Sequence, residues 1–172
     1  MTAPNTSAVY AVWRALERLL KATTFTVEDP TGIDIWFGDV LMPPAEDRAS
    51  MDRIAVASFV EPADQEWGPI GKGSREERFT AQLQVLTAIP GRTALQAAVQ
   101  LEAITSKIEL MFRDLAQTRR AGTEPAEFAP YPSWNVELGD MSPRVVPSAD
   151  GAIGSAVISV RCQFRIGTPP NT

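Results

Sequence analysis

The sequence contains no histidine and a single cysteine, and these two shortages exclude much familiar enzyme chemistry. Without histidine the chain lacks the commonest general base, so it cannot form a Ser-His-Asp triad or a Cys-His pair. Cys162 has no second cysteine for an intramolecular disulfide, and one cysteine alone cannot build a zinc site. We therefore expect neither a disulfide-stapled secreted module nor a histidine-dependent enzyme.

Nucleotide-binding motifs and long apolar runs are also missing. The segment 68–74 (GPIGKGS) resembles a phosphate-binding loop, but its spacing is wrong and it precedes a strand, where such a loop needs a helix. No apolar stretch approaches the roughly 20 residues of a membrane-spanning helix, and no basic and apolar leader follows Met1. We expect no cofactor, no membrane association and synthesis in a reducing cytoplasm.

Lysine is scarce and acidic residues are in excess. Of the 16 basic residues three are lysine, and 21 acidic residues give a net charge of −5. This balance does not favour wrapping of nucleic acid, which requires clustered Lys and Arg. Three carboxylate pairs are candidates for binding Mg²⁺, namely Asp29 with Asp34, Glu46 with Asp47, and Glu76 with Glu77. The pairs that are flanked by arginine favour solvated or interfacial ion pairs. We therefore predict no metal site and no catalytic site.

The stretch 75–117 organises the chain. Apolar side chains alternate from Phe79 to Ile89, which predicts a long half-buried strand. Pro90 and Gly91 end this strand, and Thr93 can cap the helix that follows. Leu, Ile, Val, Met and Phe then recur at helical spacing over residues 93–117. The helix is expected to fold back over the sheet, with Cys162 of a later strand pointing into the same core.

The remaining elements follow from the same reasoning, together with turn signals at prolines and glycines. We predict a helix over residues 7–22, and strands over 33–41, 53–61, 134–138 with a rough continuation over 141–147 that Pro143 interrupts, and 156–166. Residues 62–74 and 118–132 are expected to be loops. The order is αβββαββ, an α+β fold in which a mostly antiparallel sheet has two helices on one face. The chain is expected to be a single domain, residues 1–172, with flexible ends at about 1–6 and 167–172.

Interaction with other proteins is the function that the residues favour. Trp67 lies in a loop, where it is either an interaction residue or folds back onto the sheet. Arg78, Arg161 and Arg165 can meet carboxylates of a neighbouring chain, or they can be the solvated face of the sheet. The residues predicted to form a subunit or tube interface are Trp67, Lys72, Arg75, Glu76, Glu77, Arg78, Arg161 and Arg165.

The arrangement resembles one protein family. A charged strand start at 75–80 leads into 82–85, a turn and a long helix through 97–109, and a second alternating strand follows at 156–166. Together with the opening helix and the Gly-rich loop, these segments resemble the tail terminator proteins of long-tailed bacteriophages (siphoviruses), most closely those of phages infecting actinobacteria. The likeness covers nearly the whole chain. It consists of the order of the helices and strands and the general character of their residues.

The resemblance implies a structural virion protein rather than an enzyme. Tail terminators form a homo-hexameric ring at the head-proximal end of the tail, where they stop polymerisation of the tail tube. They contact the tube protein and the head-tail connector or head-closure protein, and DNA passes through their lumen without specific binding. The alternatives are another neck or tail component, namely a connector, head-closure or tube protein, or a small metal-dependent enzyme.

Overall fold

The computed structural model describes residues 7–23, 25, 33–37, 52–56, 74–87 and 89–167. The elements follow the αβββαββ order predicted from the sequence, and the α+β class is confirmed. The helices are α1 (Val9–Ala22) and α2 (Ala94–Ala121); the strands are β1 (Ile33–Phe37), β2 (Asp52–Val56), β3 (Ser74–Thr87), β4 (Ser133–Ser148) and β5 (Gly151–Gly167).

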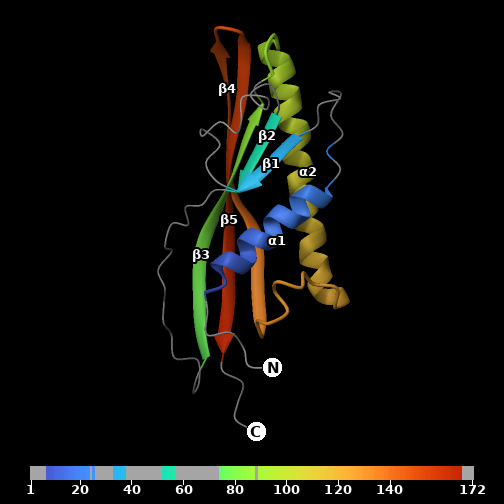
Figure 1. Ribbon diagram of the computed structural model, residues 1–172, viewed down its shortest axis with the longest axis vertical. Coiled ribbons are helices and arrows are strands. Elements are labelled where there is room, and N and C mark those ends of the chain that lie inside the picture. Colours follow the sequence, from blue (N-terminus) through green and yellow to red (C-terminus); the bar gives the residue numbers. More distant parts are fainter. Residues whose placement is uncertain are drawn as a thin grey trace.

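The strands form one sheet in the order β1-β2-β3-β5-β4. The β1 and β2 strands are parallel and the other neighbours are antiparallel, which confirms the predicted mostly antiparallel sheet. β3 pairs with β5 over its whole length, from Ser74 opposite Gly167 to Thr87 opposite Gly154. Figure 1 shows β3, β4 and β5 along the long axis of an elongated molecule. Predicted strand positions 38–41 and 57–61 lie outside the described residues.

Both helices cover the same face of this sheet (Figure 1). The buried side chains of α1 recur at intervals of three or four residues, which makes one apolar stripe; they are Ala11, Val12, Ala15, Leu16 and Leu20. The stripe of α2 contributes Leu101, Ile104, Ile108, Phe112 and Leu115 to the same core cluster. The predicted placement of the two helices on one face is thus observed.

The ends of α2 are determined by local side-chain and backbone chemistry. The Thr93 hydroxyl accepts from the Gln96 amide, and the Gln96 side chain accepts from the Thr93 amide, which makes a capping box. At the other end Gly122 adopts φ 68°, a left-handed conformation that glycine tolerates. The helix therefore continues past the predicted end at residue 117 as far as Ala121, because no helix breaker occurs before Gly122.

The inward faces of β3 and β5 form the centre of the core, as their alternation predicted. Phe79, Ala81, Leu83 and Val85 are buried on β3, opposite a matching row on β5 that runs from Ala156 through Ile158, Val160 and Cys162 to Phe164. The thiol of Cys162 points inward as expected, and burial raises its pKa to about 12. Cys162 is thus a small core residue.

The β4 strand continues through 141–147 as predicted, but it is not interrupted at Pro143. It is one strand with a bulge between Leu138 and Met141, and both Pro143 and Pro147 lie within it. Among the described strands β4 pairs with β5 alone, so it is an edge strand. Proline can be accommodated there because an edge strand has one side on which no ladder hydrogen bond is required.

Candidate interaction surface on the outer face of the sheet

The sheet face opposite the helices, here called the outer sheet face, carries three of the four predicted interface arginines, namely Arg78, Arg161 and Arg165. Successive strand residues point to opposite faces, so the residues between the buried ones form this surface. On β3 they are Glu76, Arg78, Thr80, Gln82, Gln84 and Leu86; on β5 they are the odd-numbered residues from Ile153 to Arg165; on β4 they are Asn135, Glu137, Ser142, Arg144 and Val146. The face is mainly polar.

Glu76 is the centre of a small polar network on this face. Its Oε1 atom accepts from Arg78, with Nη2 and Nε each 2.7 Å away, and also from the Gln163 side-chain amide of β5. Arg165 stands opposite Glu76 in the strand register. Three of the predicted interface residues, Glu76, Arg78 and Arg165, are therefore brought together.

Arg161 lies farther along the same face. Its Nη2 atom is 3.6 Å from Oδ2 of Asp140 at the β4 bulge, and both side chains are mostly exposed. A shallow hollow of about 450 Å³ lies between Arg78 and Arg161, floored by β3 and β5 and bordered by Asn135 and Glu137 of β4. Exposed ion pairs contribute only about 0–1 kcal/mol, so these arginines can exchange their partners for carboxylates of another chain at small cost.

Glu77 departs from the predicted surface role. It shares the inward parity of Phe79 and is 6% exposed. Its Oε1 accepts from the Ser7 hydroxyl at 2.5 Å and its Oε2 from the buried Ala8 amide at 2.7 Å. The carboxylate therefore caps the N-terminus of α1, where unpaired amides and the helix dipole favour negative charge. The same alternation that predicted the core could have placed Glu77 inside.

Tyr131 lies next to this cap. Its hydroxyl is 3.4 Å from the Ser7 carbonyl oxygen and donates to it, which links the segment before β4 to the start of α1. Burial raises the pKa of the Tyr131 phenol, and the negative charge of Glu77 raises it further. The start of α1 is thus held from two sides.

The structure does not describe the side chains of the other predicted interface residues. Trp67 and Lys72 lie outside the described residues, and Arg75 is described by its backbone, which pairs with Ile166. Both interpretations of Trp67 therefore remain predictions.

The carboxylate pairs considered for Mg²⁺ can be partly located. Glu76 and Glu77 point to opposite faces of β3 and cannot hold one ion together. Asp34 is described by its backbone, and the other candidates lie outside the described residues. Within the described part of the chain, no group of three or more His, Cys, Asp or Glu side chains is arranged to hold a metal ion.

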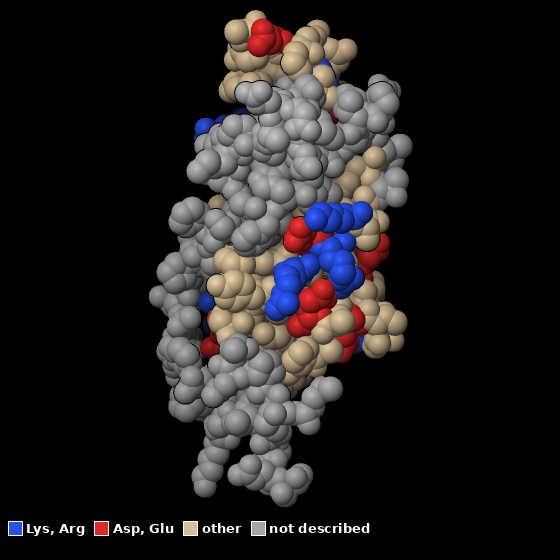
Figure 2. Space-filling model, viewed as in Figure 1, with Lys and Arg blue, Asp and Glu red and all other residues tan. Residues whose placement is uncertain are grey.

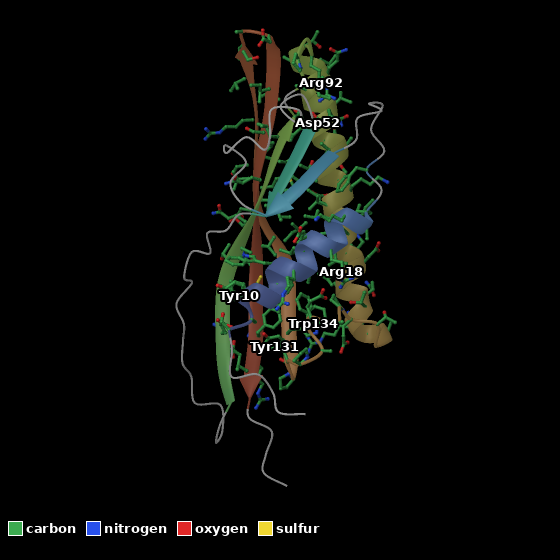
Figure 3. The ribbon with its side chains drawn as sticks, in the orientation of Figure 1. Tyr10, Arg18, Asp52, Arg92, Tyr131 and Trp134 are labelled. Atoms are coloured by element: carbon green, nitrogen blue, oxygen red, sulfur yellow. The ribbon has the colours of Figure 1, made fainter. Side chains whose placement is uncertain are left out.

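Two ion pairs between distant segments were not predicted. Asp52, at the start of β2, is fully buried, and its Oδ1 lies 2.6 Å from Nη1 of Arg92 in the turn before α2. Arg18 of α1 makes two hydrogen bonds to Glu127, at 2.9 and 2.8 Å, and these lower the pKa of that carboxyl. Figure 3 shows Asp52 and Arg92 near one end of the molecule and Arg18 on α1. No local sequence signal marks either contact.

The exposed side of α1 is densely charged. Arg14, Glu17, Arg18 and Lys21 project from it, and Glu17 accepts from Lys21 at 2.6 Å. Figure 2 shows basic side chains gathered over this helix with acidic ones beside them. The helix thus presents a second polar surface, distinct from the outer sheet face.

Comparison with known proteins adds no family assignment. No protein-family model matches the chain, and no curated protein matches its sequence. Within the described residues, no helix has both the length and the apolar character needed to cross a lipid bilayer.

Proposed function

We propose that this chain is the tail terminator of a long-tailed bacteriophage. In this role it forms a homo-hexameric ring on the head-proximal end of the tail tube, stops tube polymerisation and joins the tail to the head-completion proteins. The observation that carries the proposal is the αβββαββ order, in which a long antiparallel sheet has both helices on one face and an arginine-bearing outer face. An α+β fold of this order is what the sequence resemblance implies.

The outer sheet face supports the proposal as one side of a subunit contact. A closed ring requires two different patches on each subunit, because each copy contacts its two neighbours through different surfaces. The side chains of Arg78 and Arg161 are more than half exposed, and exposed ion pairs contribute only about 0–1 kcal/mol. Carboxylates of a neighbouring copy or of the tube protein can replace those pairs with bidentate contacts.

The charge of the chain is compatible with a ring that DNA passes through. The net charge is −5 and the isoelectric point is about 4.8. An acidic protein repels the phosphate backbone and does not retain DNA, which suits a lumen that DNA crosses without specific binding.

Negative-stain electron microscopy of the purified protein, alone and with tails, tests the proposal. We expect single rings, and rings attached to one end of tail tubes. Reversing both charges in Arg78→Glu with Arg161→Glu is expected to abolish the rings or their attachment. Arg113→Glu is the matched control, because Arg113 is an exposed arginine on α2, away from the outer sheet face.

Each alternative gives a different result in the same experiment. Extended tubes formed by the protein alone would identify a tube protein, and rings that bind heads but not tails would identify a connector or head-closure protein. Specific binding of Mg²⁺ or Mn²⁺ by the monomer would favour a metal-dependent enzyme. Normal rings and tail binding in the double arginine variant would remove the outer sheet face from the assembly.

A further inference from the structure

Tyr10 is an aromatic side chain that the fold leaves on the surface. It is 67% exposed although it lies in α1, and its ring stands edge-on to Trp13 with 5.2 Å between the ring centroids. Tyr10, Arg14 and Glu17 are spaced by four and three residues, so they share one side of the helix. Rigid exposed aromatics next to an arginine are typical anchors of protein interfaces.

A small hollow lies between α2 and β4. Its volume is about 270 Å³, and its apolar wall consists of Ala98, Leu101, Met141, Pro143 and Val145. Glu102 and Arg144, both exposed, stand at its rim. The hollow is smaller than a typical drug-sized ligand site of roughly 300–1,000 Å³. A cavity of about 150 Å³ already accepts benzene, so this hollow has room for one aromatic ring.

The surroundings of the hollow are unusually apolar for an exposed surface. Leu95 and Val99, on the same stretch of α2, are 73% and 57% exposed. Exposed apolar residues that gather in this way, with a charged rim, mark interaction sites.

We propose that Tyr10 of one copy of this chain inserts into the hollow between α2 and β4 of the next copy. Arg14 lies one helical turn from Tyr10, so it can then pair with Glu102 at the rim. The proposed contact thus combines insertion of an aromatic ring with a pair of opposite charges.

The contact is heterologous. Tyr10 stands at the start of α1 (Figure 3), whereas the hollow is lined by residues of the N-terminal half of α2 and of β4. A side chain that is 67% exposed does not fill the hollow of its own chain. A knob and a hollow on different parts of one surface repeat from copy to copy and form a ring where the rotation closes. The inference deepens the proposed function and rests on its ring of identical subunits.

Four single variants and one double variant test the contact by sedimentation velocity and electron microscopy. Tyr10→Ala removes the knob, and Tyr10→Phe keeps the ring as its matched control. Arg14→Glu and Glu102→Arg each place like charges together, and the two combined restore an opposite pair. We expect Tyr10→Ala to weaken self-association roughly 30-fold, as for an interface hot spot, while Tyr10→Phe stays close to wild type. Both single charge variants should weaken association, and the double variant should recover it.

The outcomes separate this inference from the proposed function. Rings that persist in Tyr10→Ala, or a charge-swapped double variant no better than the single ones, overturn the contact and leave the terminator proposal standing. If the wild-type chain is monomeric alone, the same variants are compared on tails, and Tyr10→Ala that caps them normally overturns the contact. Rings that depend on Tyr10 but never attach to tails support the contact and contradict the terminator. Circular dichroism melts verify that each variant is folded.

Discussion

Replacing Glu77 by alanine is expected to destabilise the chain far more than the same change at its neighbour Glu76. Glu77 is 6% exposed and accepts two short hydrogen bonds, from the Ser7 hydroxyl and from the Ala8 amide. Ala8 is itself fully buried, so its amide would lose its partner away from water. An unsatisfied buried donor costs about 1–3 kcal/mol, and loss of a helix N-cap costs about 0.5–2 kcal/mol.

These contributions overlap, because the Ala8 amide belongs to both. We therefore expect Glu77→Ala to lower the free energy of unfolding by about 3 kcal/mol. For a chain of this size that corresponds to a melting temperature lower by roughly 6–12 °C. Glu77→Gln keeps an acceptor oxygen for the Ala8 amide and loses the charge at the helix N-terminus, so its effect should be smaller, about 1 kcal/mol.

Urea unfolding followed by circular dichroism measures both effects at a fixed protein concentration. Glu76→Ala is the control, because Glu76 is the adjacent residue on the opposite face and loses surface hydrogen bonds to Arg78 and Gln163. We expect it to change the free energy of unfolding by less than about 1 kcal/mol. Equal losses at the two positions would refute the assignment of Glu77 as the cap of α1.

Three further results are expected from single positions. Gly151→Ala should destabilise the β4–β5 hairpin by about 2 kcal/mol or more in thermal melts, because Gly151 has φ 132° and an added Cβ would lie 2.6 Å from the Arg92 carbonyl oxygen; a melting temperature equal to wild type would contradict this. The Cys162 thiol, with a pKa near 12, should react with a thiol reagent only as fast as the chain unfolds, and rapid native-state labelling would contradict its burial. Arg18 lowers the pKa of Glu127, so this pair should stabilise the fold above the unfolded pKa near 4.5 and lose its contribution as the pH falls through the lower folded pKa. In urea titrations Glu127→Gln should therefore lose less stability on acidification than wild type. Identical pH profiles for the two proteins would contradict this.

Periodicity was sufficient for the long elements. The alternation through Phe79, Leu83 and Val85 predicted the inward face of β3, and Thr93 was correctly expected to cap α2. Those signals are local, because strand parity and capping depend on residues only a few positions apart. The end of α2 was placed four residues early because Thr118–Ala121 has neither a strong apolar stripe nor a breaker before Gly122.

The candidate site was predictable only in part. Arg78, Arg161 and Arg165 were placed on one sheet face by parity, and the structure has them there. Glu77 was grouped with Glu76 as part of a charged strand start, although its parity is that of Phe79. Glu77 is buried in spite of its charge because its carboxylate accepts a hydrogen bond from the N-terminus of α1, which is 69 positions away in the sequence. Such long-range compensation has no local signature.

The growth of tail tubes in the presence of this protein tests the central claim most directly. Tube protein from the same virion is polymerised with and without the purified chain, and tube lengths and ends are measured by electron microscopy. We predict that growth stops and that each arrested tube carries one ring at a single end. Tubes that keep growing without an attached ring would contradict the assignment as a tail terminator.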